Sequence, residues 1–142
     1  MKPTLQILRQ PYLQGAQTEF LNAYEHYRKG RFEEAINECL KAFESTMKSI
    51  YERHGWHYSK TSTVDQLISI GFDKELIPRH WKSSYNNLRT LLSSSVPTGR
   101  NFLGGHGRGT EQRVVSEPTV AYLLHMTASA ILFLGSSNEL LE

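Results

Sequence analysis

The 142-residue sequence predicts an all-α protein, an up-and-down bundle of about five helices with a glycine-rich loop before the last one. Along most of the chain, apolar residues recur at intervals of three and four, the spacing of one helix face. No segment alternates apolar and polar residues as a half-buried strand would. We therefore expect a single helical domain at residues 16–142. Residues 1–15, which contain Pro3 and Pro11 and show no clear period, are expected to form a lead-in segment.

A helical hairpin is expected to open the domain. Helical spacing predicts a first helix from Ala16 to Lys29, interrupted by Gly30. A second helix is predicted from about Arg31 to His54, ending at Gly55, a residue suited to a left-handed cap. Because the break between the two is short, the helices should lie antiparallel. The second helix carries a long apolar stripe, made of Phe32, Ala35, Ile36, Cys39, Leu40, Phe43, Met47 and Ile50.

Two shorter helices follow. Thr63 and Gln66 have the spacing of a capping box, which predicts a helix from Val64 to Ile70, closed by Gly71. Pro78 suits the first turn of the next helix. That helix should end by Val96, because Pro97 disfavours helical backbone in the residue before it. Its apolar face comprises Trp81, Tyr85, Leu88, Leu91 and Leu92.

The last helix is expected to begin at Ser116-Glu117-Pro118, which offers a cap, an acid at the positive dipole end and a proline in the first turn. It is apolar nearly all round from Val120 to Leu134, so it should lie centrally in the bundle. We expect it to end at Gly135. His125, within this apolar helix, is interpreted as a core histidine rather than a catalyst.

Composition is that of an ordinary soluble protein, with 39% hydrophobic and 21% charged residues. Cys39 is the single cysteine, and its place on an apolar stripe predicts a core residue. No uninterrupted apolar run approaches the ~20 residues of a membrane span, and the first residues lack the apolar core of a signal peptide. We therefore expect a cytoplasmic location and no membrane partner.

Positive charge is concentrated in one part of the chain. No Asp or Glu occurs from Leu76 to Thr110, whereas five cations do: Arg79, Lys82, Arg89, Arg100 and Arg108. Such a local field can concentrate a polyanion although the net charge is only +2. The alternative is an ordinary solvated helix face.

The glycine-rich loop is the strongest functional signal. Between Gly99 and Gly109, five of the ten glycines fall within eleven residues. Glycine lets another molecule approach the backbone closely, at an entropic cost. The loop also holds a guanidinium and an imidazole, so it suits an anion. It is not a nucleotide-binding phosphate loop, because no Lys-Ser/Thr pair follows it and no strand precedes it.

Four polar residues of this loop can bind or transfer something, namely Arg100, Asn101, His106 and Arg108. Arg100 can grip phosphate oxygens at any working pH, and His106 can move a proton near neutrality. Together they could cleave RNA without a metal, by activating a ribose 2′-hydroxyl against the adjacent phosphate. Asn101 could donate to the phosphate or hold the histidine, and Arg108 could contact RNA. The alternative is a flexible loop whose polar residues are only solvated.

The segment Arg100-Asn101-Phe102-Leu103-Gly104-Gly105-His106-Gly107 resembles the C-terminal domain of abortive-infection proteins, a member of the HEPN superfamily. Residues 121–128 resemble it too, and residues 39–52 resemble the family's second-helix segment. The resemblance covers roughly residues 16–135. It implies a helical bundle and an endoribonuclease that needs no metal or cofactor, in phage defence or a toxin–antitoxin system. Its products would carry 2′,3′-cyclic phosphate and 5′-hydroxyl ends.

The resemblance also implies site residues and partners. Arg100, Asn101 and His106 match the family motif, and Glu44 and Lys48 match the second-helix segment as supporting residues. Glu44 would orient Arg100 or His106; the alternative is a surface pair with Lys48. A homodimer would bring two histidines into one cleft for the two proton-transfer roles. RNA is the expected substrate. An antitoxin or a fused N-terminal domain is a partner that the resemblance leaves open.

Other functions are kept as alternatives. Some members of the family have lost catalysis, so the chain could be a non-catalytic module that binds RNA or protein or mediates dimerisation. Residues 20–42 also resemble one tetratricopeptide unit, which would make Tyr24 and Tyr27 part of an adaptor surface, but no second copy is visible. Tyr85 and Asn87 are weaker site candidates. The histidines at 54, 57 and 80 lack carboxylate or cysteine partners, so no metal site is expected.

Overall fold

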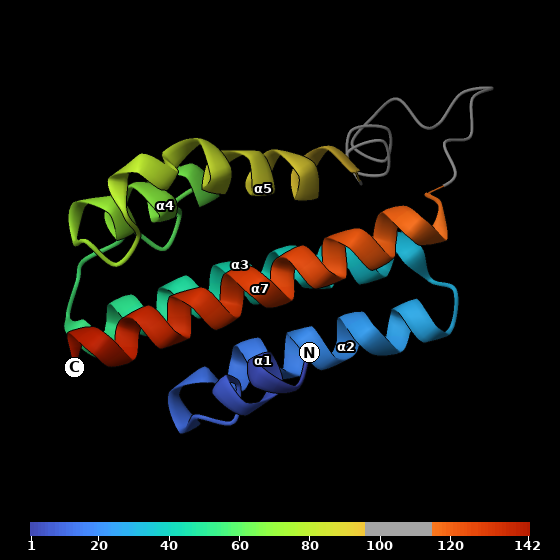
Figure 1. Cartoon of the computed structure of the whole chain (residues 1–142), viewed down its shortest axis with the longest axis horizontal. Coiled ribbons are helices and arrows are strands. Elements are labelled where there is room, and N and C mark those ends of the chain that lie inside the picture. The colour runs from blue at the N-terminus through green and yellow to red at the C-terminus, as the bar shows by residue number, and fades with distance from the viewer. Residues whose placement is uncertain (96–114) are drawn as a thin grey trace.

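The computed structural model describes residues 1–95 and 115–142, which form helices and connecting loops without any strand (Figure 1). The all-α prediction is confirmed. The glycine-rich loop lies outside the described residues. The described elements are α1 (Lys2–Ile7), η1 (Pro11–Leu13), α2 (Gln14–Arg28), α3 (Phe32–His54), α4 (Val64–Asp73), η2 (Arg79–Trp81), α5 (Lys82–Ser95) and α7 (Glu117–Leu141), where η marks a short 3₁₀ helix.

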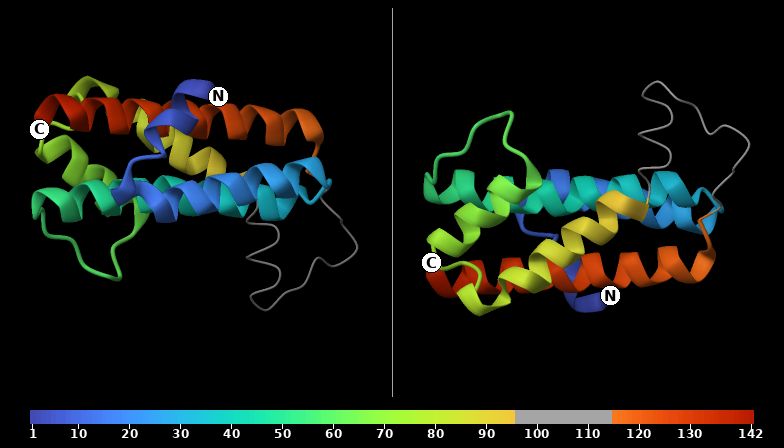
Figure 2. Two further views of the ribbon diagram at one scale, coloured as in Figure 1. Left: turned by 90° about the horizontal axis from the view of Figure 1, so that it is seen from below. Right: turned by 90° about the horizontal axis from the view of Figure 1, so that it is seen from above.

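The four long helices, α2, α3, α5 and α7, alternate in direction, as the up-and-down prediction requires (Figures 1 and 2). The helix α3 packs against α2, α4, α5 and α7 and is the centre of the fold. Its predicted apolar stripe is buried apart from the half-buried Phe32, and Phe43, Met47 and Ile50 are fully inaccessible. Burying side chains of this size contributes about 1.5–3 kcal/mol each, so this stripe contributes substantially to stability.

The hairpin of α2 and α3 forms where the sequence predicts it. The second helix ends at Gly55, which adopts a left-handed backbone with φ of +74°. A residue with a Cβ would be strained there, which explains why the helix stops at a glycine. In the last turn of α3, Tyr51 is fully buried and its hydroxyl donates to the backbone oxygen of Leu67 at 2.6 Å. This bond ties α3 to α4.

The capping box that begins α4 is also present. The Gln66 backbone N–H donates to Thr63 Oγ1 at 3.2 Å, and the Thr63 N–H donates to Gln66 Oε1 at 2.8 Å. The predicted stop at Gly71 is wrong, because α4 continues to Asp73. Gly71 instead lets α4 lie close to the core, since a Cβ there would stand 2.7 Å from Ile77 Cδ1. Pro78 precedes η2, and α5 begins only at Lys82.

The helix α7 begins at the predicted place, with Ser116 as N-cap, but it runs past Gly135 to Leu141. Gly135 is a packing residue rather than a stop: a Cβ there would overlap Ile7 of α1. By length and composition α7 could cross a membrane, although polar residues interrupt its apolar runs. Half of that stretch is buried within the bundle, and core helices pass the same test.

Residues 1–15, expected to be a lead-in, contain α1, η1 and the start of α2, and contribute side chains to the core. Leu8 and Leu13 are fully buried, in a second apolar cluster with Phe20 and Ile131. The Thr4 hydroxyl donates to the backbone oxygen of Ala128 at 2.8 Å, which fixes α1 on α7. The helix α1 could not be predicted from hydrophobic periodicity, because six residues are too few to show a period. Pro3 is compatible with α1 because it lies in the first turn, where proline is tolerated.

Candidate functional site

The predicted catalytic and RNA-binding residues, Arg100, Asn101, His106 and Arg108, lie outside the described residues. What the structure does place are the two helices that border them. The C-terminal end of α5 and the N-terminal end of α7 both lie toward the end of the bundle where α2 ends and α3 begins (Figures 1 and 2). The chain thus leaves and re-enters the described fold at this end, which we call the open end.

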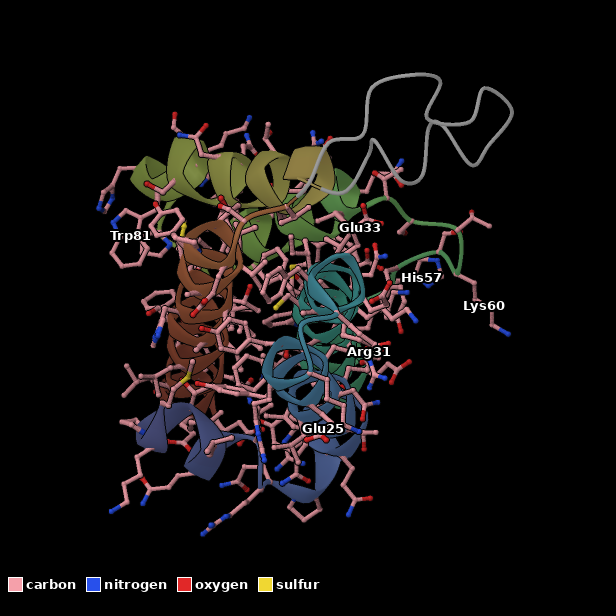
Figure 3. All side chains as sticks on the ribbon, turned by 90° about the vertical axis from the view of Figure 1, so that its right-hand side faces the viewer. Glu25, Arg31, Glu33, His57, Lys60 and Trp81 are labelled. Atoms are coloured by element: carbon pink, nitrogen blue, oxygen red, sulfur yellow. The ribbon has the colours of Figure 1, made fainter. Side chains whose placement is uncertain are left out.

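Polar residues of α2, α3 and α7 lie at the open end, which faces the viewer in Figure 3, where Arg31 and Glu33 are labelled. The Tyr27 hydroxyl of α2 donates to Glu117 Oε1 at the start of α7, at 3.1 Å. This bond raises the pKa of Tyr27, because a neighbouring carboxylate disfavours the phenolate. Arg31 Nε donates to His26 Nδ1 at 2.9 Å, and Glu33 lies in the first turn of α3. The two acids therefore stand at helix N-termini, where the helix dipole favours negative charge.

Glu44 and Lys48, the predicted supporting residues, both lie on α3 and are half-buried. Glu44 is engaged in a polar interaction. The neighbouring Phe43 stacks on Tyr85 of α5, with ring centroids 6.2 Å apart. Glu44 is therefore at the level where α5 packs on α3, roughly 16 Å along the helix from Glu33. It lies beside the middle of the bundle rather than at the open end.

The structure confirms some of the remaining single-residue predictions and contradicts others. Cys39 is fully buried, as expected. The interpretation of His125 as a core residue is wrong, because its side chain is exposed on α7. An apolar helix with all-round hydrophobicity gives no sign of which face points outward. Tyr85, a weak site candidate, is a core residue, and burial raises its pKa. Asn87 is exposed on α5.

A buried polar network lies at the opposite end of the bundle and was not predicted from the sequence. Asn138 of α7 is fully buried. Its Oδ1 is hydrogen-bonded to His54 Nε2, and its Nδ2 donates to the Tyr12 hydroxyl at 2.9 Å. The His54 ring stacks on Trp56, with centroids 4.3 Å apart. The sequence feature that could have predicted this network is Asn138 itself, a polar amide near the end of an apolar helix. Since both polar atoms of Asn138 are satisfied, this network joins three segments rather than forming an open site.

The cations of the acid-free stretch have different surroundings. Arg89 holds Asp65 with two hydrogen bonds, of 2.8 and 2.7 Å, so its charge is used within the fold. Arg79 and Lys82 instead line a pocket between α4 and the start of α5. In the described residues, no group of three or more His, Cys, Asp or Glu side chains is placed to hold a metal ion.

Comparison with known proteins identifies the family of the fold. A family model, Abi_C, described as a HEPN-like domain, matches residues 14–137. The chain belongs to this family. No curated protein and no solved structure matches the chain. The HEPN-like match spans α2 to α7 and includes the Arg100-Asn101 and His106 positions, so the resemblance noted in the sequence is confirmed at the level of family and fold. The family match alone does not assign an activity to this HEPN-like domain.

Proposed function

We propose that this HEPN-like domain is a metal-independent endoribonuclease that acts in phage defence or a toxin–antitoxin system. The observation that carries the proposal is the Arg100-Asn101 and His106 motif inside a chain that belongs to the HEPN-like family. The two helices that border the motif approach one end of the bundle, which supports a site there.

In the proposed reaction, the ribose 2′-hydroxyl attacks the adjacent phosphorus. His106 of one copy, as base, takes the proton of the 2′-hydroxyl, and His106 of a second copy, as acid, protonates the departing 5′ oxygen. Arg100 stabilises the charge that builds on the phosphate oxygens, with its planar fork of donors. The 2′ oxygen–phosphorus bond forms as the phosphorus–5′ oxygen bond breaks. The products are a 2′,3′-cyclic phosphate and a 5′-hydroxyl, without oxidation, reduction or added water.

Asn101, Glu44 and Lys48 are proposed to support these two residues. Arg100 is the fifth residue after Ser95, and five extended residues span roughly 17 Å. The chain is therefore long enough for Arg100 to fold back beside α3, where a carboxylate such as Glu44 could fix the guanidinium. Arg108 is proposed to contact an RNA phosphate outside the reacting centre.

A homodimer is part of the proposal, because a base and an acid are two roles and each loop offers one histidine. The outward side of α7 supports it: no Asp, Glu, Lys or Arg occurs from Pro118 to Asn138, and Tyr122 is 57% exposed. An open groove of about 390 Å³ beside it, between α5 and α7, is lined by Trp81, Met126 and Phe133 among others. A twofold contact places each face against its own copy, so an uncharged face avoids like-charge repulsion.

The test is cleavage of end-labelled RNA in excess EDTA. We expect cleavage to persist, with cyclic phosphate ends, and to stop where the attacking ribose carries a 2′-O-methyl group. Arg100→Ala and His106→Ala should each lower kcat by roughly 10²–10⁴, the usual contribution of such groups. Arg9→Ala and His57→Ala, which change exposed residues of the same types after α1 and after α3, should leave the rate unchanged.

A strict metal requirement, or full activity of His106→Ala, would defeat the mechanism. Wild-type protein that folds and binds RNA without turnover would favour the non-catalytic module. Circular dichroism and thermal unfolding of each variant would separate lost chemistry from lost fold.

A further inference from the structure

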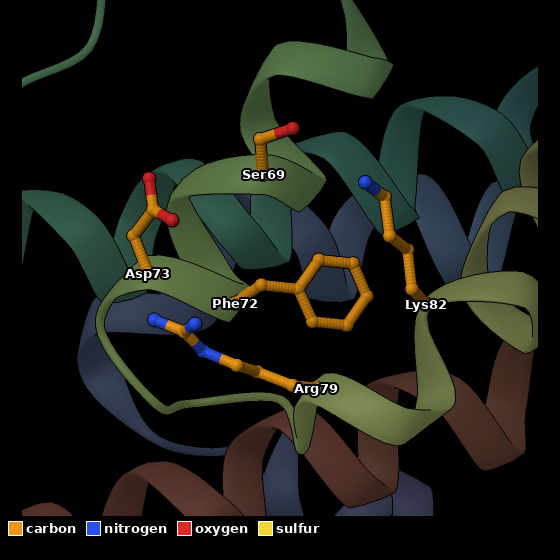
Figure 4. A pocket seen from close by; sticks show the side chains of 5 residues that line it. All are labelled: Ser69, Phe72, Asp73, Arg79 and Lys82. Atoms are coloured by element: carbon orange, nitrogen blue, oxygen red, sulfur yellow. The ribbon is translucent and has the colours of Figure 1, made fainter.

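A small pocket lies where α4 meets η2 and the start of α5, away from the predicted catalytic segment in sequence. Its volume is about 190 Å³, and its lining comes from Ser69, Phe72 and Asp73 on one side and Arg79 and Lys82 on the other. Figure 4 shows the Phe72 ring lying between the side chains of Arg79 and Lys82, with the Asp73 carboxylate on the Arg79 side. Because Phe72 is only 7% exposed, it forms an apolar floor rather than a free stacking surface.

The charges of this pocket are available to a ligand. Arg79, Lys82 and Asp73 are exposed at the surface. Among the described residues, no ion pair joins Asp73 to either cation, whereas Arg89 further along α5 is taken up by Asp65. The pocket therefore presents two cationic donors, one carboxylate acceptor and one hydroxyl around an apolar floor. Two cations without a local partner, placed together, favour an anionic ligand.

We propose that this pocket binds one phosphate–ribose unit of the RNA strand, an assignment that rests on the proposed nuclease function. Arg79 and Lys82 hold the phosphate oxygens through charge-assisted hydrogen bonds. The Asp73 carboxylate accepts a hydrogen bond from the ribose 2′-hydroxyl, the group that distinguishes RNA from DNA. A carboxylate would repel a bare phosphate, so its presence favours a ligand that carries hydroxyl donors beside the anion. The small volume suits a phosphate and its sugar, with the base left outside.

The position of the pocket along α5 gives the site a role. Lys82 begins this helix and Ser95 ends it, about 20 Å away at 1.5 Å per residue. The segment with Arg100 and His106 follows directly. The pocket would therefore hold the strand several nucleotides from the cut, and it would contribute to binding of long RNA but not of short RNA. Phosphate contacts position a strand without reading its sequence, so no base preference is expected from it.

The test measures binding by fluorescence anisotropy, using the full chain with His106→Ala so that the RNA stays intact. We expect Arg79→Gln and Lys82→Gln each to weaken binding of a single-stranded RNA dodecamer by several-fold. Each should also lower the slope of log K against log salt by about 0.7, the value for one phosphate contact on a single strand. Lys74→Gln, a loss of the same charge at an exposed position just after α4, should do neither. A trinucleotide should bind all four proteins alike.

Asp73→Asn tests the ribose contact. It should strengthen binding of a DNA dodecamer of the same sequence and bring the RNA-to-DNA affinity ratio closer to one. If Asp73→Asn leaves the ratio unchanged, the ribose contact is wrong. If Lys74→Gln weakens binding as much as Arg79→Gln does, the pocket is not a site and only general charge acts.

Two further arms separate the neighbouring possibilities. A ribonucleoside monophosphate that competes as well as the dodecamer would identify a free-nucleotide site and overturn the assignment to the strand. Failure of the proposed nuclease function would be seen in a different experiment. Wild-type protein would then not cleave RNA in the presence of chelator, whatever the affinities of the binding variants.

Discussion

At the residue scale, Cys39 shows how burial controls chemistry. Its side chain is fully inaccessible on the apolar stripe of α3, and desolvation raises its pKa to about 12. The thiolate is the reactive form, and a rise of about three units lowers its population roughly a thousandfold at neutral pH. The charged form is disfavoured chiefly because burial removes its water, and the nearby Glu38 carboxylate adds repulsion.

We therefore expect Cys39 to resist a thiol reagent such as dithiobisnitrobenzoate in native protein at pH 8, and to react at once in denaturant. Because it is the single cysteine, the labelling rate reports opening of the core directly. Labelling in native buffer at the rate of a free cysteine would contradict this placement. The buried-core interpretation came from sequence period alone, since an apolar stripe identifies its own inward face.

Other residues could not be interpreted in that way. His125 lies in a helix that is apolar on every side, so period gives no inward direction. Gly71 and Gly135 were both predicted to end helices, because glycine lowers helix propensity. In each case a neighbouring side chain from elsewhere in the fold occupies the space of the missing Cβ. Such tertiary reasons for a glycine are invisible in the local sequence.

At the scale of elements, the sequence predicted best those helices that carry their own boundaries. The capping box at Thr63 and the left-handed Gly55 act within a few residues, and both occur as predicted. The short α1 has no local signal of that kind and depends on its contact with α7. Element prediction therefore succeeded where local backbone chemistry decides and failed where packing between distant segments decides.

The contact of α1 with α7 gives a prediction for Gly135→Ala. The added Cβ would overlap Ile7, and overpacking of this kind costs typically ~1–3 kcal/mol. We expect urea unfolding to show a lower free energy of unfolding by about that amount. Gly15→Ala in α2 is the matched control, because nothing lies within 4 Å of its Cβ position; its stability should be unchanged or slightly raised.

Combining Gly135→Ala with Ile7→Ala supplies the coupling test. The shorter side chain leaves room for the new methyl group, so the double variant should lose less stability than the sum of the two single losses. Simple additivity of the two losses would show that the helices do not meet at this point.

At the scale of the molecule, the fold class, the family and the order of the helices could be read from the chain. For the candidate site, the sequence predicts which side chains would react but not their geometry. Arg100 and His106, which carry the motif, lie in a loop outside the described residues. What the fold adds is the placement of the bordering helices at the open end, and an uncharged face on α7. The first feature supports a site at the open end, and the second supports the proposed homodimer.

The assembly itself can be tested by a charge on that face. Ser129 lines the groove between α5 and α7 and is exposed, so Ser129→Glu should leave the monomer folded. In a twofold dimer the two new carboxylates and their desolvation would oppose association. We expect Ser129→Glu to shift the protein to monomer in analytical ultracentrifugation and to lower RNA cleavage in parallel. Thr18→Glu, on the exposed surface of α2, lines neither the groove nor the pocket of Arg79 and Lys82, and should change neither. In mixed dimers with His106→Ala in one subunit, a shared site predicts activity per dimer far below half of wild type, because one of the two proton-transfer groups is missing from every cleft. Activity of half or more, or an active monomeric Ser129→Glu, would mean that each subunit cleaves alone and that its single loop histidine serves as both base and acid.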